Sequence, residues 1–300
     1  MNVLVSGAAG FVGSALVPFL TRAGHEVKPL ARRGRDGAPS PSAPHWDPPA
    51  NQIDLGPGPI DAVIHLAGEN IAQRWNAEAK KRIRESRVDA TRLLCTALAK
   101  QSPKPRVLIA ASAIGFYGDR GDEVLTESSS PGTGFLADLC QQWEAAAQPA
   151  INAGIRVVHL RFGVLLDPSG GALKNMLPPF RAGVAGRLGS GRQFISWATR
   201  HDAVRAIDHA LQAPGLRGPV NVVSPKPVTN SEFTRTLARV LGRPAILHMP
   251  AFVLRLLAGE MANEALLASA KVVPGQLEEG GFQFEDVGIE PALRKLLVRP

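Results

Sequence analysis

The chain has little of several residue types, and each scarcity excludes a class of protein. Only two of its 300 residues are cysteines, Cys95 and Cys140, and they lack the spacing of a metal site. A disulfide framework and a cysteine-ligated metal are therefore excluded, and we expect two buried, reduced thiols. One tyrosine and four scattered tryptophans provide no row of aromatic side chains on which nucleic-acid bases could stack.

Long hydrophobic runs are also missing. No stretch of about 18 apolar residues is present, so no membrane-spanning helix is expected. The first 21 residues carry no charged side chain, which at first suggests a secretory signal, but the first basic side chain is Arg22 and Gly7, Gly10 and Gly13 interrupt the apolar stretch. We therefore expect a soluble, cytoplasmic protein that does not bind membranes.

The net charge of +8 raises the question of a nucleic-acid partner. Between Arg74 and Arg92, however, basic residues alternate with Glu78, Glu85 and Asp89 along a predicted helix. Such interleaving is typical of a solvated helix face. We expect no nucleic-acid partner, and we expect the local basic clusters to suit an anionic small molecule.

The first thirty residues have the pattern of a strand, a glycine turn, a helix and a second strand. Residues 2–6 are a β-rich run, residues 7–13 contain three glycines, an apolar periodic stretch follows to residue 23, and residues 26–31 are again β-rich. Further strands at 61–66, 106–111 and 155–161 alternate with helices at 76–100 and 134–153. This alternation predicts an α/β fold: a Rossmann-type, doubly wound parallel sheet with helices on both faces.

The looser pattern of the C-terminal half predicts a smaller, mostly helical substrate lobe. We expect a Rossmann core over residues 1–165, to which residues 198–225 return, a substrate lobe from 166–197 and 226–246, and a small C-terminal domain over 247–300. Residues 32–59 are rich in Pro, Gly and Ser, which predicts a surface loop with at most one short edge strand.

The three glycines of the turn follow a strand directly and open a helix. In a dinucleotide-binding turn, Gly7 permits the tight bend, Gly10 lets the backbone approach a pyrophosphate, and Gly13 packs the helix on the strand. The pyrophosphate then meets free N–H groups at the positive end of the helix, next to Phe11 and Val12. The alternative is a plain strand-to-helix turn.

Basic side chains stand where an NAD-binding protein would have a carboxylate. About 20 residues beyond the turn, an Asp or Glu would bind the ribose hydroxyls of NAD, whereas this chain has Arg32 and Arg33, with Arg35 nearby. A guanidinium pairs with a 2′-phosphate through two parallel hydrogen bonds. The predicted cofactor is NADP(H); the alternative is a basic loop that extends into water.

Several further motifs together carry a family resemblance. They are the Gly-x-x-Gly-x-x-Gly spacing, His65-Leu66-Ala67-Gly68 at a strand end, Ser112 at another strand end, Tyr117-Gly118 and Arg161. With these motifs, and with residues 67–75, 112–122, 134–144 and 170–197, essentially the whole chain resembles the extended short-chain dehydrogenase/reductase family. It is most similar to its atypical, NAD-dependent epimerase/dehydratase-like branch, whose substrate is unknown and which ends in a small helical domain.

The turn, the basic pair and the resemblance together define the expected cofactor contacts. The predicted cofactor-binding residues are Gly7, Gly10, Phe11, Val12, Gly13, Arg32, Arg33, Leu66, Ala67, Gly68, Ala111 and Arg161. For Arg161, which follows an apolar strand, the anionic partner could equally be a cofactor phosphate or a nearby carboxylate. The resemblance places His65 as a structural residue beside the turn.

The catalytic pattern of the parent family is incomplete. Ser112 matches the family's serine, but the Tyr and Lys of its Tyr-x-x-x-Lys motif fall on Phe135 and Leu139. General acid-base catalysis contributes roughly 10²- to 10⁴-fold to a rate, which a phenylalanine cannot supply. Another group must move the proton, or the protein does not catalyse ordinary alcohol/ketone redox chemistry.

Two side chains are candidates for the missing proton donor. Tyr117 could donate its phenolic proton, or it could be a packed aromatic whose hydroxyl is satisfied within the protein. Glu69 could act as an acid if burial beside the cofactor raises its pKa, or it could cap a helix or lie in a solvated loop. The predicted catalytic residues are Ser112, Tyr117 and Glu69, and no metal site is predicted.

These observations predict an NADP(H)-binding oxidoreductase or epimerase acting on a small carbonyl or sugar-like substrate. Basic residues of the lobe would suit an anionic substrate such as a nucleotide-sugar, or they would simply be solvated; they are Lys174, Arg181, Arg187 and Arg192. The absence of the Tyr/Lys pair supports a second interpretation, a non-catalytic sensor or scaffold that binds NADPH.

Overall fold

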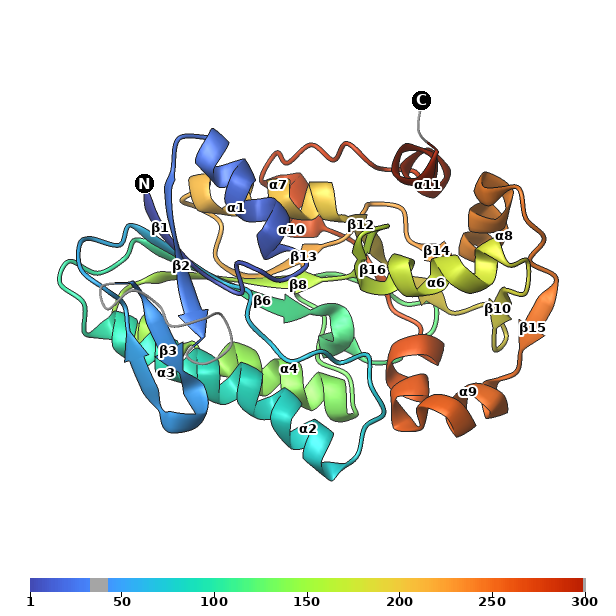
Figure 1. Ribbon diagram of the computed structural model, residues 1–300, viewed down its shortest axis with the longest axis horizontal. Coiled ribbons are helices and arrows are strands. Elements are labelled where there is room, and N and C mark those ends of the chain that lie inside the picture. The colour runs from blue at the N-terminus through green and yellow to red at the C-terminus, as the bar shows by residue number, and fades with distance from the viewer. Residues whose placement is uncertain (33–42, 299–300) are drawn as a thin grey trace.

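An eight-stranded sheet forms the centre of the computed structural model, which describes residues 1–32 and 43–298 (Figure 1). Its strands, in spatial order, are β13 (Gly218–Val222), β8 (Arg156–Phe162), β6 (Val107–Ala113), β5 (Ala62–His65), β1 (Asn2–Ser6), β2 (Glu26–Arg32), β3 (His45–Asp47) and β4 (Gln52–Asp54). All neighbouring pairs are parallel except β3 and β4. The chain leaves β1 toward one edge and later toward the other, which confirms the predicted doubly wound sheet.

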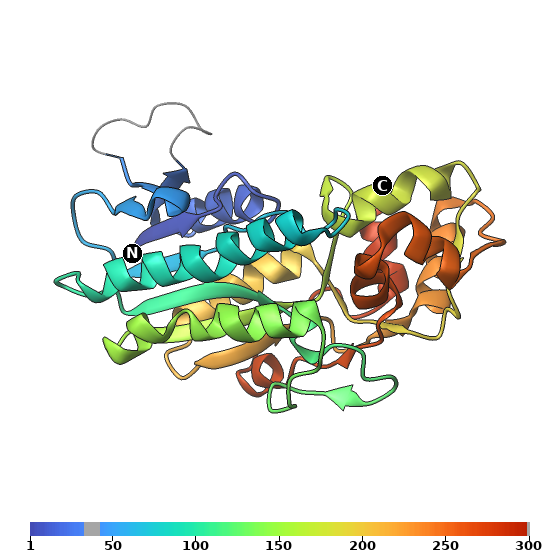
Figure 2. The same ribbon diagram turned by 90° about the horizontal axis from the view of Figure 1, so that it is seen from below.

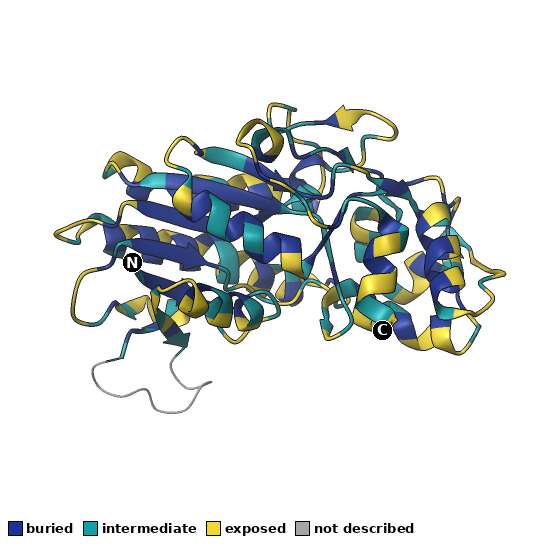
Figure 3. Cartoon of the chain, turned by 90° about the horizontal axis from the view of Figure 1, so that it is seen from above, coloured by how far each residue is buried: buried dark blue, intermediate teal, exposed yellow. Residues whose placement is uncertain are grey.

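Helices cover both faces of this sheet. The strand residues alternate between the faces, so that Val3 and Val5 belong to one hydrophobic cluster and Leu4 to the other. The first cluster includes α1 (Gly13–Arg22), α7 (Arg200–Gln212) and α10 (Gly275–Glu279), and the second includes α3 (Ala90–Ala99) and α5 (Gln148–Asn152). Figure 3 shows the central strands of the sheet mostly in the colour of buried residues, and β1, β5, β6 and β8 are buried along almost their whole length.

Two predicted helices are present but interrupted. The helix predicted over 76–100 consists of α2 (Ala77–Arg84), a π-helical turn η2 (Glu85–Asp89) and α3. The helix predicted over 134–153 is divided into α4 (Phe135–Ala145) and α5, because Pro149 in the first turn of α5 has no N–H to continue the ladder. Figure 2 shows α2 to α3 and α4 to α5 running side by side in front of the sheet, on one of its faces.

The predicted loop at residues 32–59 contains two short strands, so the prediction of at most one is wrong. Strands β3 and β4 form a hairpin around a short 3₁₀ helix, η1 (Pro48–Ala50), at the edge of the sheet. The hairpin is anchored by Trp46, which is buried in the second cluster against Leu30 and Leu55. Burial of one large aromatic side chain stabilises a structure that the turn-forming composition disfavours.

A helical lobe adjoins the sheet. Its cluster contains Leu173 of α6 (Gly171–Arg181), Leu237 of α8 (Asn230–Leu241), Leu293 of α11 (Ile289–Leu297) and Trp197. Three short strand pairs connect the segments of the lobe. They are β9 (Val164–Asp167) with β12 (Trp197–Thr199), β10 (Gly186–Leu188) with β15 (Leu247–Met249), and β11 (Phe194–Ile195) with β14 (Val228–Thr229).

The C-terminal segment, predicted as a small domain over 247–300, packs with both other parts of the molecule. It contains α9 (Ala251–Ala258), a π-helical turn η4 (Ala262–Leu267), and β16 (Lys271–Val272), which pairs with β7 (Val124–Leu125). Leu277 and Phe282 lie in the first cluster, on the face of the sheet covered by α1 and α7, and Leu293 lies in the cluster of the lobe. The segment therefore ties the lobe to the sheet.

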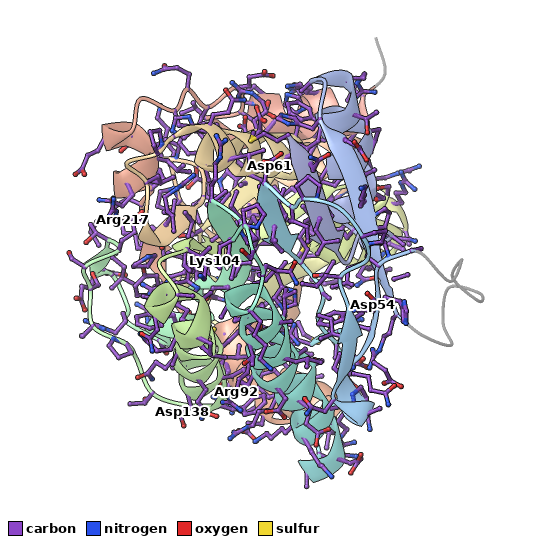
Figure 4. All side chains as sticks on the ribbon, turned by 90° about the vertical axis from the view of Figure 1, so that its left-hand side faces the viewer. Asp54, Asp61, Arg92, Lys104, Asp138 and Arg217 are labelled. Carbon is purple, nitrogen blue, oxygen red and sulfur yellow. The ribbon has the colours of Figure 1, made fainter. Side chains whose placement is uncertain are left out.

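All carboxyl ends of the parallel strands lie at one edge of the sheet. Asp61 and Lys104, which precede β5 and β6, mark the opposite edge (Figure 4). There the Asp61 carboxylate accepts the backbone N–H of Asn2 at 2.7 Å. The glycine turn, Gly68 and Ser112 follow or end their strands, so the topology gathers them at the carboxyl edge, where open α/β sheets bind ligands.

Candidate active site

A side chain on each glycine of the first turn would meet different surroundings, so the three glycines have different roles. Gly7 has a φ of +72°, and a Cβ there would lie 2.8 Å from the backbone nitrogen of Ala67. A Cβ on Gly13 would lie 2.1 Å from the carbonyl oxygen of Gly7, so α1 could not pack on the turn. A Cβ on Gly10 would meet only that same oxygen, at 3.1 Å, and would otherwise point into open space. Gly7 and Gly13 are thus needed for packing, and Gly10 keeps space free.

A groove of about 750 Å³ lies against this turn, and we call it the glycine groove. It is lined by residues 7–10 of the turn, by Arg32 at the end of β2, by Ala67 and Gly68 after β5, and by Ser86. No side chain caps the amino end of α1. The N–H groups of Ser14 and Ala15 already donate to the carbonyls of Gly10 and Val12, at 2.9 and 3.1 Å, so an anion in the groove would be attracted mainly by the positive end of the helix dipole.

Four other predicted cofactor residues are not among those that line this groove: Phe11, Val12, Leu66 and Ala111. Phe11 packs its ring on the lobe, where a Cβ on Gly170 would lie 2.4 Å from Phe11 Cδ2. Val12 forms the N-cap of α1, and Leu66 packs between two hydrophobic clusters. Ala111 lies in β6 within a cluster of apolar side chains. Arg33 and Arg35 lie outside the described residues.

A buried polar network begins at Ser112. The Ser112 hydroxyl donates to Glu144 Oε1 at 2.7 Å, and Arg161 donates to the two Glu144 oxygens from Nε and Nη2, each at 2.8 Å. Arg161 Nη1 donates to the Tyr117 hydroxyl at 2.9 Å, and that hydroxyl donates to Asn221 Oδ1 at 2.7 Å. The Arg161–Glu144 ion pair therefore joins β8 to α4, and its hydrogen bonds extend the network to β6 through Ser112 and to β13 through Tyr117 and Asn221.

The charges in this network explain its pKa shifts. Burial would lower the pKa of Arg161, but the hydrogen bonds and the charge of Glu144 outweigh it and raise that pKa. Burial raises the pKa of Tyr117, against the opposing charge of Arg161. Both groups keep their protons at neutral pH, so Arg161 is a cation and Tyr117 is a neutral phenol.

The network bears on the alternatives that the sequence left open. Arg161 has its anionic partner in Glu144, at 4% and 14% side-chain exposure, so the geometry favours the carboxylate over a cofactor phosphate. Tyr117 is fully buried and both of its hydrogen bonds are made within the protein. This geometry favours the packed aromatic over the proton donor. Ser112 is 3% exposed and its proton is directed at Glu144.

The two positions of the missing Tyr/Lys pair are apolar. Phe135 and Leu139 are buried with Trp75, whose ring meets the Phe135 ring edge-on at 5.1 Å. Glu264, from the C-terminal segment, accepts the backbone N–H groups of Phe135 at 3.0 Å and of Leu136 at 2.7 Å. A carboxylate thus caps α4 beside the position where the family has its tyrosine.

Glu69 lies partly buried just beyond Gly68. Its backbone N–H donates to the Ser86 hydroxyl at 3.0 Å. It does not cap the next helix, because Asn76 accepts the Ala79 N–H at the start of α2. Of the roles considered for Glu69, the cap of the next helix is therefore excluded, while the proton-donating acid and the solvated loop residue both remain.

His65 is a structural residue, as the resemblance implied. It is fully buried at the end of β5, with Nδ1 2.6 Å from the Ser6 hydroxyl and Nε2 3.0 Å from the Thr91 hydroxyl. Trp143 Nε1 also donates to Thr91, at 3.0 Å. Burial, with a smaller effect of the Arg87 charge, lowers the pKa of His65 to about 4. The neutral ring joins the sheet to α3 and α4.

Sequence reasoning missed four residues of this region: Glu144, Asn221, Glu264 and Arg87. Arg161 in an apolar strand did indicate an anionic partner, either a cofactor phosphate or a carboxylate, but nothing in the sequence selects Glu144 from the 26 acidic residues. Glu264 lies 129 residues from Phe135, so only the fold brings them together.

The two cysteines are free and buried, and burial raises the pKa of each thiol to about 12.

Comparison with known proteins defines the class. Residues 3–223 match the NAD dependent epimerase/dehydratase family, so the chain belongs to this family. Residues 249–296 match a domain of unknown function, DUF1731. None of the described helices is long and apolar enough to cross a membrane.

Individual relatives extend along the whole chain. An epimerase family protein of Mycobacterium tuberculosis is 44% identical over 301 residues, which cover 99% of this chain and 98% of the relative. The crystal structure of human epimerase family protein SDR39U1 (isoform 2) with NADPH is 34% identical with a TM-score of 0.90 and 99% of each chain covered. A nucleoside-diphosphate sugar epimerase from Corynebacterium glutamicum is also 34% identical, with a TM-score of 0.80 over 99% of this chain and 58% of that one. These relatives confirm the resemblance to the atypical epimerase-family branch.

Proposed function

We propose that the protein is an NADP(H)-dependent oxidoreductase or epimerase that acts on a small carbonyl or sugar-like substrate. The observation that carries this proposal is the glycine groove, where Gly10, the uncapped end of α1 and Arg32 surround one space of about 750 Å³. Helix N–H groups suit the pyrophosphate of a dinucleotide. Two relatives support the assignment, the human protein crystallised with NADPH and the bacterial nucleoside-diphosphate sugar epimerase.

Arg32 makes the preference for the phosphorylated cofactor testable. It ends β2 and lines the glycine groove, where a guanidinium can pair with a 2′-phosphate. Replacing Arg32 and Arg33 with alanine should therefore weaken the binding of NADPH far more than that of NADH, measured by calorimetric titration. An equal loss for both cofactors would refute the 2′-phosphate contact.

A bound nicotinamide would supply or accept the hydride. The chain's own contribution is to orient the reacting oxygen and to move its proton. We assign the first role to Ser112, at the carboxyl end of β6, and the second to Glu69, a partly buried residue that directly follows Gly68 of the glycine groove. Tyr117 is the weaker candidate because its hydroxyl is already committed to Arg161 and Asn221.

Three conservative variants separate these roles. Turnover should fall at least about a hundredfold in Ser112→Ala or Glu69→Gln, since acid-base groups contribute at that level. Tyr117→Phe, compared at equal folded fraction, should keep its turnover. Loss of activity in Tyr117→Phe alone would return the proton-donor role to Tyr117.

One observation favours a second candidate function, a sensor or scaffold that binds NADPH without turnover. Phe135 and Leu139 are buried at the two positions where the family has its Tyr and Lys. Incubation with NADPH and a panel of aldehydes, ketones and nucleotide-sugars distinguishes the two functions. Brisk NADPH oxidation with any substrate excludes the sensor, and binding without oxidation across the panel favours it.

A further inference from the structure

The Phe11 side chain connects the glycine turn to the helical lobe. Gly10, its neighbour in the turn, lines the glycine groove, whereas Phe11 does not. The Phe11 ring lies against Gly170 and Gly171, at the start of α6, the first helix of the lobe along the chain (Figure 1). A Cβ on Gly170 would lie 2.4 Å from Phe11 Cδ2, and a Cβ on Gly171 would lie 2.9 Å from Phe11 Cε1. One aromatic ring of the turn is therefore seated on the lobe.

The two glycines beneath this ring are needed for different reasons. Gly171 has a φ of +62°, so a side chain there is strained whatever its surroundings. Gly170 has a φ of −167°, an extended backbone that any residue can adopt. The three atoms nearest to a Cβ on Gly170 all belong to the Phe11 ring. The ring therefore explains why position 170 has no side chain.

Arg200 and Asp167 join the same contact. Arg200 Cζ lies over the Phe11 ring, 5.3 Å from its centre, and Arg200 Nη1 donates to the Phe11 carbonyl at 3.4 Å. Arg200 Nε pairs with Asp167 Oδ2 at 3.1 Å, and both side chains are largely buried. Asp167 Oδ1 accepts the N–H of Ser169 at 2.8 Å, so this carboxylate also shapes the turn that leads to Gly170. The ring and the backbone of Phe11 are both held by the lobe side of the contact.

We propose that Phe11 is a positioning residue that couples occupation of the glycine groove to the placement of the substrate lobe. This inference rests on the proposed function, which places the cofactor in the groove. A cofactor that fixes residues 7–13 also fixes the Phe11 ring, and the ring restrains residues 167–171 and the start of α6. Coupling between two sites requires an element whose arrangement affects both, and the Phe11 ring is such an element. Bound cofactor therefore favours substrate binding.

A double-mutant cycle tests the contact without any ligand. Gly170→Ala should lower the thermal unfolding midpoint by about 3 °C or more, because its Cβ overlaps the ring. In a Phe11→Ala background the same substitution should have no such effect, since the ring is gone. The matched control is Gly215→Ala, at an exposed glycine outside the left-handed region where a Cβ would meet nothing within 4 Å. This control should shift the midpoint by at most about 1 °C.

Hydrogen exchange with and without saturating NADPH measures the coupling itself. In the wild type, NADPH should slow amide exchange about fivefold or more both in the glycine turn and in residues 168–176. In Phe11→Ala, NADPH should still protect the turn but no longer slow exchange in residues 168–176. Phe11→Leu, which keeps an apolar side chain, should retain part of the effect. A purely structural role for Phe11 would change exchange equally with and without NADPH.

Two results would overturn the coupling while the proposed function stands. One is an equal loss of stability from Gly170→Ala in both backgrounds, which would show that the ring does not contact the lobe as described. The other is NADPH-dependent protection of residues 168–176 that is absent in the wild type or unchanged in Phe11→Ala. If the wild type does not bind NADPH at all, the proposed function falls and the inference falls with it. Titration of the wild type with NADPH distinguishes these failures.

Discussion

Replacing Glu144 with glutamine tests whether the network beneath the site is a structural unit. Glu144 accepts hydrogen bonds from Nε and Nη2 of Arg161 and from the hydroxyl of Ser112, and the ion pair is almost entirely buried. Glutamine keeps the size but turns one acceptor into a donor and removes the charge. Leaving one member of a buried ion pair without its partner costs about 3–5 kcal/mol, so we expect Glu144→Gln to lose about 3 kcal/mol of unfolding free energy.

The assay is equilibrium unfolding in guanidinium chloride, with Glu123→Gln as the matched control. Glu123 pairs with Arg120 at 2.6 Å, but the carboxylate side chain is 49% exposed. Exposed pairs contribute less than about 1 kcal/mol, so the control should lose at most that amount. If Glu144→Gln is no less stable than Glu123→Gln, the network does not hold the strands and helix together as described.

Two further predictions concern the turn and the pH dependence of stability. Gly10→Ala should fold normally, because its Cβ meets only one oxygen at 3.1 Å, yet bind NADPH at least about tenfold more weakly. Gly13→Ala, whose Cβ would lie only 2.1 Å from the Gly7 carbonyl oxygen, should lose about 1–3 kcal/mol of stability. Denaturation and titration of both variants check this, and equal behaviour of the two variants would contradict it. The pKa of His65 is about 4 in the folded chain and 6.5 in the unfolded chain, so its contribution is fully present above pH 6.5 and is lost as the pH falls toward 4, by about 3 kcal/mol at most. Unfolding curves at several pH values should show this loss in the wild type and not in His65→Asn, and an equal loss in both would contradict the assignment.

The parts of the fold that could be predicted are those that depend on neighbouring residues. The glycine turn, the first two strands and α1 follow from residues within about thirty positions of each other, and the alternation of strands and helices indicated the doubly wound sheet. The β3–β4 hairpin was missed because its anchor, Trp46, is buried against side chains outside the loop. The π-helical turn η2 has no periodicity that separates it from α2 and α3.

In the candidate site too, the features that depend on residues close in sequence could be predicted, and those that depend on distant residues could not. Gly7, Gly10 and Gly13 are close in sequence, and their roles could be inferred from spacing and strand-to-helix context. The partners of Ser112 and Tyr117 could not be inferred, because Glu144 is 32 residues from Ser112 and Asn221 is 104 residues from Tyr117. The parallel order of β6, β8 and β13, together with the packing of α4 against β6, brings these side chains together.

Calorimetric titration of the full chain with NADPH and with NADH, at moderate ionic strength, is the most direct measurement of the central claim that the glycine groove binds a phosphorylated dinucleotide. The account predicts saturable binding at one site per chain, tighter for NADPH than for NADH. Absence of saturable heat with either the oxidised or the reduced form of the phosphorylated cofactor would contradict it.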